Sequence, residues 1–376
     1  MNIPTPLHII DLDRLSNNLS GTILKIKQKT SCNFLFAIKG FSSPYILPYM
    51  YDYLDGISAS GLFEARLGKS IFHKHVCTYS PAYKSDEILS IITYSDSIVF
   101  NSINQFNKYS KTAKEHGCSC GIRINPEFSF FSDSYKVNPC QKYSRLGITK
   151  EHMPPLHMFG KGKIEGIHLH IMCEQNSDDL KKTVCMLMDK YEPYLKRIKW
   201  INLGGGQLYC DRNYQIDTAI DTIRSLNKRF DCEIFLEPCT GVVTGCGYLI
   251  TSVIDIVNNG MNVAIIDGSA VCHLPDVVFD DWKHDICGAS SDYNLFQYKY
   301  RIAGPSCYPG DIWGDYSFPK RLSVGDHIIF KDTAMYSMVK SSYFNGINLP
   351  SLAIFQKNEG LKILKTYDYE AFFNCQ

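Results

Sequence analysis

Four features of this 376-residue chain share one property: a residue capable of chemistry, or a run of glycines, stands at the end of a short apolar segment. They are Lys39 in "FAIKG", His168 and His170 in "HLH", Gly204, Gly205 and Gly206 in "LGGG", and Glu237 in "FLEP". An amine, two imidazoles, a bare stretch of backbone and a carboxylate are different chemical groups. They act together only if the fold brings them to one place.

Lys39 and Glu237 are charged residues in apolar surroundings. A lysine at an apolar strand end loses hydration, which favours its neutral amine and makes it a nucleophile suited to bonding an aldehyde. The alternative is a packed stem with a solvated ammonium group. A carboxylate in such surroundings needs a partner, because an isolated buried charge is costly. A ring nitrogen would serve Glu237, and so would a helix cap or a structural ion pair.

The glycine triplet and the two histidines suit an anion and an aromatic ligand. Backbone N–H groups without side chains around them can approach a phosphate closely, although a tight turn would also explain three glycines. Alternation along a strand places His168 and His170 on one face. His170 suits stacking against a ring, and His168 suits the core. A metal site would need a third ligand, and the sequence has none at a matching spacing.

Eight short apolar segments alternate with longer stretches of helical period, which indicates parallel βα units. The predicted strands are 33–38, 55–58, 75–79, 97–101, 119–125, 164–170, 199–203 and 233–237. Helices are predicted at 43–54, 102–116 and 178–196, and the insert 126–163 is predicted to be loop with room for one helix. Eight such units predict an α/β fold of the (β/α)8 TIM barrel type.

The carboxyl ends of barrel strands form the functional face of such a fold. Lys39, "SASG" at 58–61, the two histidines, the glycine triplet and Glu237 all stand at that end of their predicted strands. We therefore expect them to meet.

The pattern changes after about residue 246. "VAIIDGSA", "YNLFQYKYRIAGP", "GDHIIF" and "AMYSMVKSSYF" are typical of short strands joined by turns, and "PLHIID" at the N-terminus is also strand-like. We expect a barrel over residues 11–248. A C-terminal β domain of sandwich or barrel type would combine residues 249–376 with the N-terminal strand in residues 1–10.

The composition favours a small-molecule partner. Lys and Arg number 39 against 38 Asp and Glu, and the absence of a block of like charges argues against nucleic acid or a membrane surface. The N-terminus lacks the layout of a signal peptide, and no apolar run reaches the length of a membrane span. Fifteen cysteines in such a chain indicate a reducing cytoplasm. The sequence contains no paired CxxC motifs, so it predicts no structural zinc site.

These motifs resemble the pyridoxal 5′-phosphate (PLP) decarboxylases of basic amino acids, which have an alanine-racemase-type barrel. "FAIKG", "HLH", "LGGG", "EP", "GPSC" and "AMY" occur in the order of that family, from the N-terminal strand to about Tyr336. "FAIKGF", "HLHIMCE", "GSAVCHLPDV" and "GPSCYPGDIWGDY" are most similar to the branch of polyamine biosynthesis that converts carboxynorspermidine or carboxyspermidine to norspermidine or spermidine.

The resemblance implies a role for each motif. The catalytic and cofactor-binding residues would be Lys39 at the PLP aldehyde, His170 against its ring, Glu237 at its ring nitrogen, Gly204, Gly205, Gly206 and Tyr336 at its phosphate, and Cys307 as the acid that protonates the substrate carbon. Cys307 would come from the second subunit of a homodimer. The amines of the substrate would meet Asp276, Asp311 and Glu174.

One motif departs from the family, and other functions stay open. "EPCT" stands where "EPG" followed by Arg or Glu is usual, so Cys239 and Thr240 replace residues that help at the phosphate or the substrate. The same machinery would also suit diaminopimelate or another basic amino acid. A non-catalytic PLP-binding protein is typically a single barrel without a β domain, and a metal-dependent barrel hydrolase would need the missing third ligand.

Overall fold

The computed structural model describes residues 3–130 and 138–376. It divides into two compact units, Asn17–Val242, and Met1–Ser16 together with Val243–Gln376. The domain boundaries expected from the sequence, after residues 10 and 248, stay a prediction.

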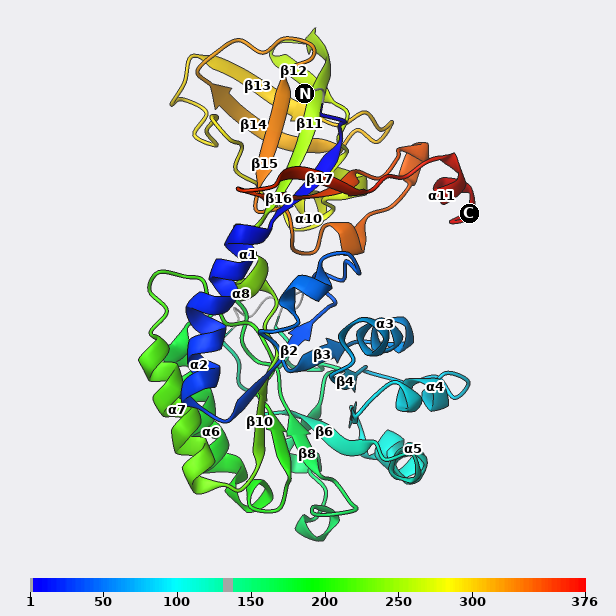
Figure 1. Cartoon of the computed structure of the whole chain (residues 1–376), viewed down its shortest axis with the longest axis vertical. Helices are drawn as coiled ribbons and strands as arrows, with labels where there is room; N and C mark the ends of the chain where they lie inside the picture. The colour runs from blue at the N-terminus through cyan, green and yellow to red at the C-terminus, as the bar shows by residue number, and fades with distance from the viewer. Residues whose placement is uncertain (1–2, 131–137) are drawn as a thin grey trace. The chain divides into compact units, whose positions relative to one another are not determined.

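Eight parallel strands form a closed barrel in the first unit (Figure 1). The strand order is β5-β4-β3-β2-β10-β9-β8-β6, and β6 pairs back with β5 to close the ring. The strands are β2 Cys32–Ala37, β3 Gly56–Ala59, β4 His75–Tyr79, β5 Ser97–Phe100, β6 Ser119–Asn125, β8 Gly166–His168, β9 Trp200–Asn202 and β10 Glu233–Leu236. The predicted barrel and all eight of its strands are confirmed.

Helices follow most of these strands and cover the barrel (Figure 1). They are α2 Leu24–Lys29, α3 Leu62–Phe72, α4 Ile88–Thr93, α5 Ile103–Glu115, α6 Ser177–Leu195, α7 Ile216–Arg229 and α8 Thr240–Val243, and α1 Leu12–Asn18 joins α2 through a π-helical turn. Side chains cap the two predicted helices that form: Ser102 Oγ accepts from the Gln105 amide in α5, and the Asn176 side chain accepts from the Asp178 amide in α6.

The predicted helix at 43–54 is wrong. The segment forms turns and one short 3-10 helix, Leu47–Met50. Pro48 has no N–H group and its ring clashes with the preceding helical turn, which disfavours an α-helix through this position. The Ser43 hydroxyl is buried without a hydrogen-bond partner among the described residues, so it does not cap a helix.

The insert 126–163 is mostly loop, as predicted. Its described part holds a two-residue strand, β7 Ile148–Thr149, paired with β6, and two 3-10 turns, Lys150–His152 and Leu156–Met158. Residues 131–137 of the insert lie outside the described residues.

The amino-terminal end of the barrel interior is filled by the indole of Trp200. A Cβ atom on Gly121 would lie 2.3 Å from this ring, and one on Gly166 would lie 2.0 Å from it. Glycine in both neighbouring strands therefore makes room for the tryptophan, which packs with Leu35 and Phe235. With this end packed, polar groups gather at the opposite, carboxyl end of the strands.

The second unit is a mostly antiparallel eight-stranded sheet. The N-terminal strand β1, Leu7–Asp11, lies between β11 and β16, as Figure 1 shows in blue, which confirms that the sheet domain takes up the first strand. The other strands are β11 Gly247–Asn258, β12 Asn262–Ile266, β13 Tyr298–Ala303, β14 Ile312–Phe318, β15 His327–Lys331, β16 Ser351–Gln356 and β17 Gly360–Lys365, and the short helices are α9 Ala270–His273, α10 Asp276–Phe279 and α11 Tyr369–Phe373.

The strand expected in "AMYSMVKSSYF" is wrong, because residues 334–344 form turns and 3-10 helices. The Ser337 hydroxyl donates to the Thr333 carbonyl, and the Ser341 hydroxyl donates to the Ser337 carbonyl. Such local side-chain to backbone bonds compete with the bonds of a strand ladder. Tyr336 in this turn has a positive φ of 50°.

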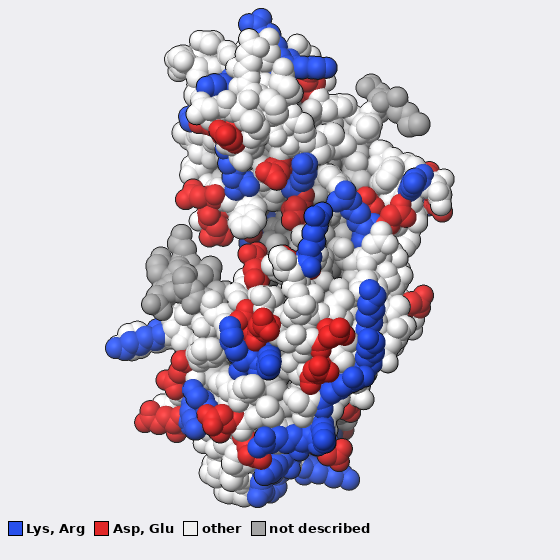
Figure 2. Space-filling view, turned by 90° about the vertical axis from the view of Figure 1, so that its left-hand side faces the viewer, with Lys and Arg blue, Asp and Glu red and all other residues white. Residues whose placement is uncertain are grey.

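Charges of both signs are interspersed over most of the face drawn in Figure 2, with basic side chains gathered towards its lower end. Within the described residues, no helix has the length and apolar character needed to span a bilayer.

Candidate active site

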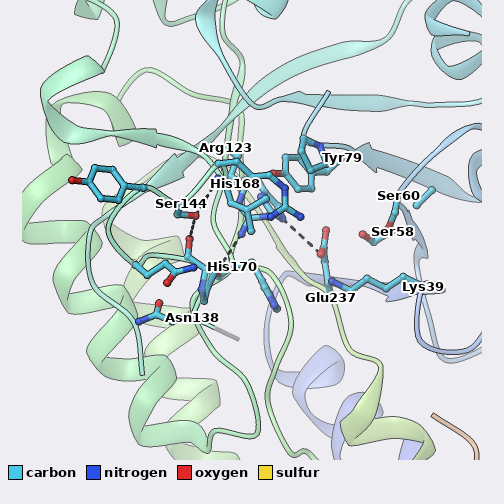
Figure 3. Close-up of a pocket in the computed structure, with 17 residues that line it drawn as sticks. Lys39, Ser58, Ser60, Tyr79, Arg123, Asn138, Ser144, His168, His170 and Glu237 are labelled. Atoms are coloured by element: carbon cyan, nitrogen blue, oxygen red, sulfur yellow. Dashed lines mark hydrogen bonds and ion pairs between the residues drawn. The ribbon is translucent and has the colours of Figure 1, made fainter. Parts of the chain in front are cut away.

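A cavity of about 470 Å³ opens in the barrel unit at the carboxyl ends of the strands (Figure 3). One part of its lining consists of residues at or just beyond strand ends, and the rest comes from the loop 138–146. The strand-end residues are Lys39, Ser58, Ala59, Ser60, Tyr79, Pro81, Arg123, His168, His170 and Glu237. This lining brings together residues that the strand-end rule expected to meet: Lys39, residues of "SASG", the two histidines and Glu237.

Glu237 is an acidic residue of this cavity lining, and it is buried. Its Oε1 accepts a hydrogen bond of 2.8 Å from Asn202 Nδ2, and its Oε2 lies 3.7 Å from Nε2 of the buried His168. Burial would raise the pKa of Glu237, but His168, the charge of Lys39 and the Asn202 bond outweigh it and lower that pKa to about 2. Glu237 is therefore a buried anion at neutral pH.

His170 is held as a neutral ring. Its Nδ1 accepts a hydrogen bond of 3.2 Å from the Gly205 amide, so the proton of the neutral ring is on Nε2. Burial lowers the pKa of His170 well below its usual value, and the charges of Lys39 and Arg123 lower it further. Burial also lowers the pKa of His168.

Lys39 lies just beyond β2, and its side chain points into the cavity towards Glu237 (Figure 3). The sequence suggested an amine stripped of water, and this expectation is wrong for the structure, since Lys39 is exposed within the open cavity. Lys39 points into the site because it stands just beyond the end of β2, and not because apolar residues surround its amine.

The glycine triplet packs against both His170 and Glu237. A Cβ atom on Gly205 would lie 2.2 Å from the Glu237 carbonyl oxygen, and one on Gly206 would lie 2.0 Å from the Met172 carbonyl oxygen. Gly204 and Gly206 also have positive φ angles of 70° and 91°. Glycine is thus required here for backbone conformation and for close approach. The Gly204 amide donates to Asn202 Oδ1 at 2.9 Å.

Two cavity residues were missed from the sequence. Tyr79 ends β4 and stacks on His168, with ring centroids 5.2 Å apart and planes 20° apart. The buried Arg123, near the end of β6, lies with its guanidinium carbon 4.7 Å from the centre of the Tyr79 ring, and it donates to the His170 carbonyl. The strand-end rule that selected Lys39 also applies to "CTY" and "IRIN", so it could have found both.

Four predicted site residues belong to the second unit. Asp311 is buried and accepts hydrogen bonds from Ser269 Oγ, the Ala270 amide and the Ser306 amide. Cys307 is exposed. Asp276 pairs with Lys340, whose Nζ lies 4.8 Å from the centre of the Tyr336 ring.

Two further predicted features lie in the barrel unit. Glu174 is exposed, has a positive φ of 56° and stands outside the cavity lining. Cys239 of "EPCT" is buried, and burial raises the pKa of its thiol to about 12. The thiol that replaces the usual glycine of the family motif is therefore uncharged.

Residues 48–334 match the family described as pyridoxal-dependent decarboxylase, C-terminal sheet domain. The chain belongs to this family. It is a decarboxylase with PLP as its cofactor, which sets aside the non-catalytic and metal-hydrolase alternatives. The matched range begins after Lys39 and ends before Tyr336.

The decarboxylase resembles characterised relatives over nearly its whole length. It is 34% identical to carboxynorspermidine/carboxyspermidine decarboxylase of Campylobacter jejuni, covering 98% of each chain. It is 32% identical to carboxyaminopropylagmatine decarboxylase of Synechocystis, covering 99% of this chain and 95% of the relative. The crystal structure of carboxynorspermidine decarboxylase complexed with norspermidine from Campylobacter jejuni superimposes with a TM-score of 0.90 at 32% identity, covering 100% of each chain.

The cavity of this decarboxylase fits PLP. A buried anion, Glu237, suits a protonated ring nitrogen, and the neutral ring of His170 suits the face of an aromatic ring. The triplet at 204–206 leaves a backbone surface that a Cβ atom would obstruct. Lys39 supplies a primary amine in the same cavity for the aldehyde.

Proposed function

We propose that this decarboxylase removes the carboxyl group of carboxynorspermidine or carboxyspermidine and releases norspermidine or spermidine. Two relatives at 34% and 31% identity, each covering 98% of this chain, are named for these substrates. The observation that carries the proposal is the cavity in which Lys39 points towards the buried carboxylate of Glu237.

PLP, when bound, supplies an aldehyde that bonds an amine and a ring that accepts the electrons of the breaking carbon–carbon bond. In our proposal Lys39 binds that aldehyde. Glu237 keeps the ring nitrogen protonated, because a buried anion with a pKa of about 2 stays charged throughout the working pH range. Asn202 and His168 hold the carboxylate of Glu237 in place.

His170 and the glycine triplet orient the cofactor in this proposal. The bond from the Gly205 amide to His170 Nδ1 fixes the imidazole, so that its face can lie against the ring. The Gly204 and Gly205 amides already donate to Asn202 and His170. The Gly206 amide has no partner in the part of the chain that the structure describes, and we assign it to the phosphate together with Tyr336.

We also assign Cys307 as the acid that protonates the substrate carbon. It stands on an exposed loop of the sheet unit, where its amide donates to Asn345 Oδ1 at 2.8 Å. In the proposed homodimer this thiol would serve the active site of the other subunit. A thiol can act as a general acid while it holds its proton.

The three acids proposed for the substrate amines have different surroundings. Asp276 forms an ion pair with Lys340, and both carboxylate oxygens of Asp311 accept hydrogen bonds within the sheet unit. Glu174 is exposed, so its carboxylate is accessible to an ammonium group of the substrate. We therefore rank Glu174 first for the tail of the substrate.

We propose a cytoplasmic location, because all fifteen cysteines are free and several are exposed, which suits a reducing compartment.

The test is a comparison of substrates with the purified PLP-loaded protein. Carboxynorspermidine, carboxyspermidine, carboxyaminopropylagmatine and meso-diaminopimelate are supplied in parallel, and carbon dioxide release gives kcat/KM for each. We expect one of the first two to give the highest value. Turnover of diaminopimelate alone would refute the proposed substrate. A preference for carboxyaminopropylagmatine would replace the proposed substrate with an amino acid that has a guanidinium tail.

A further inference from the structure

We propose that Asn101 is a positioning residue of this active site, whose side-chain amide fixes the Tyr79 ring and clamps the loop 138–147 that walls the cavity. The proposal concerns the same site as the proposed function and rests on it for its kinetic consequences. Its structural consequence can be measured without substrate.

Asn101 stands directly after β5 and links three parts of the chain. Its Oδ1 accepts hydrogen bonds from the Tyr79 hydroxyl at 2.8 Å and from the Gly147 amide at 2.7 Å, while its Nδ2 donates to the Arg145 carbonyl at 2.8 Å. An asparagine side chain offers two lone pairs and two N–H groups, so both lone pairs are used. Aspartate could not replace it, because a second acceptor would then face the Arg145 carbonyl.

The bond to Tyr79 acts on the centre of the site. Tyr79 stacks on His168, and Nε2 of His168 lies 3.7 Å from Oε2 of Glu237. The Tyr79 ring can tilt away from His168 only if its hydroxyl moves away from Asn101. Asn101 therefore restrains, through Tyr79, the imidazole that faces the buried carboxylate.

The two bonds to the loop act on the opposite wall. Asn138, Gln141, Tyr143, Ser144 and Arg145 of this loop line the cavity. The loop closes on itself through the Ser144 hydroxyl, which donates to the Pro139 carbonyl at 2.6 Å. Asn101 holds the end of this loop against the barrel, beside a close backbone approach at Gly147, where a Cβ atom would lie 2.8 Å from the Ile124 carbonyl carbon. Directly after the loop, Ile148 of β7 pairs with β6.

One neutral side chain thus connects both walls of the cavity to the end of β5. Small displacements of groups around a reacting centre reduce rates strongly, by up to roughly a hundredfold for a shift of about 1 Å. We expect a loss of Asn101 to loosen the loop and to reduce kcat/KM while Lys39, His170 and Glu237 remain present.

The experiment compares Asn101→Ala, Tyr79→Phe and the double variant with the wild-type holoenzyme. Asn258→Ala is the matched control, because the Asn258 side chain also donates to a nearby residue, Asn262 Oδ1 at 3.0 Å, but in a hairpin of the sheet unit. The readouts are kcat and KM separately, the melting temperature, and the rate at which trypsin cuts after Lys142 and Arg145, followed by mass spectrometry.

We expect Asn101→Ala to reduce kcat/KM by about 10- to 100-fold and to speed cleavage after Lys142 and Arg145 severalfold. Tyr79→Phe should reduce kcat/KM by less and leave cleavage unchanged, because the bonds to Arg145 and Gly147 remain. The double variant should have the kcat/KM of Asn101→Ala, since both changes remove the same bond.

Wild-type cleavage and wild-type kcat/KM in Asn101→Ala would overturn the proposal. So would a lower melting temperature with neither readout changed, which would make Asn101 a stability residue only. If Asn101→Ala fails to fold, unchanged kcat/KM in Tyr79→Phe overturns the Tyr79 part. If the wild-type enzyme turns over none of the four substrates, the proposed function fails. The comparison of trypsin cleavage then still tests whether Asn101 holds the loop 138–147 in place.

Discussion

Nε2 of His168 lies 3.7 Å from Oε2 of Glu237, with both side chains almost wholly buried at the floor of the cavity. Burial lowers the pKa of His168, so the imidazole is neutral near pH 7, whereas Glu237 remains ionised. A neutral ring beside a buried carboxylate leaves the negative charge available to a cationic ligand group. A protonated pyridine nitrogen is such a group.

Removing the amine at position 39 should remove covalent cofactor binding. Lys39→Ala should fold normally, since Lys39 is exposed, but it should lack the visible absorption band of lysine-bound PLP. Absorbance spectra after dialysis against PLP give the measurement. Lys228→Ala, a change at an exposed lysine in α7, should keep the band. A band that persists in Lys39→Ala would assign the attachment to another lysine.

Neutralising Glu237 should change both the rate and the acid stability. The pKa of Glu237 is about 2 in the folded protein against 4.5 for the free group, so its stabilising effect is complete above pH 4.5 and is lost as the pH falls towards 2. Glu237→Gln should therefore flatten the fall in the free energy of unfolding across that window, as measured by urea titration. It should also reduce kcat by about 100-fold at pH 7.

The control for that change is Glu233→Gln, at an exposed glutamate that begins β10, the strand that Glu237 follows, and this variant should retain kcat and the wild-type acid profile. An unchanged kcat in Glu237→Gln would show that the ring nitrogen needs no anion here.

Replacing Gly206 with alanine should lower the free energy of unfolding for two reasons, the positive φ and a steric clash of the added methyl group. A Cβ atom there would lie 2.0 Å from the Met172 carbonyl oxygen, and φ is 91°. Gly260→Ala is the matched control, with a φ of 77° and nothing within 4 Å. We expect Gly260→Ala to cost about 1–2 kcal/mol of unfolding free energy and Gly206→Ala about 3 kcal/mol or more, with weaker PLP binding in the latter alone. Equal costs would mean that the backbone at Gly206 can move.

Replacing Asp311 should separate two roles. Both of its carboxylate oxygens accept hydrogen bonds, from Ser269 Oγ and from the Ala270 and Ser306 amides, so it braces the loop that carries Cys307. Asp311→Asn should lower the unfolding free energy by about 2 kcal/mol and reduce kcat, because an amide cannot accept all of these bonds. A higher KM at unchanged stability would instead make Asp311 the substrate contact that the sequence predicted.

Removing the thiol at position 307 should affect chemistry without affecting the cofactor. Cys307→Ala should keep the bound PLP spectrum and lose about 10²- to 10⁴-fold in kcat, which is the usual range for a general acid. Cys287→Ala, at another exposed cysteine of the sheet unit, should keep both the spectrum and kcat. Wild-type turnover in Cys307→Ala would remove this residue from the proton transfer.

The sequence was sufficient for the barrel and for the residues at its strand ends. Runs of apolar, β-branched residues are local signals, and the carboxyl ends of parallel strands meet whatever fills the loops. The strand-end rule therefore predicted that Lys39, His168, His170 and Glu237 meet, and all four line one cavity. The local signal misled at 43–54, where a helical pattern of apolar residues contains Pro48.

Only the tertiary structure decided how these residues are supported. Tyr79 and Asn101 are 22 residues apart, and Asn101 and Gly147 are 46 apart, so their bonds form only once β4, β5, β6 and β7 have come together. The ionised state of Glu237 likewise depends on Asn202 and His168, which come from neighbouring strands. A strand can be recognised from consecutive residues, whereas hydrogen bonding and burial depend on residues that are far apart in the sequence and meet only in the folded chain.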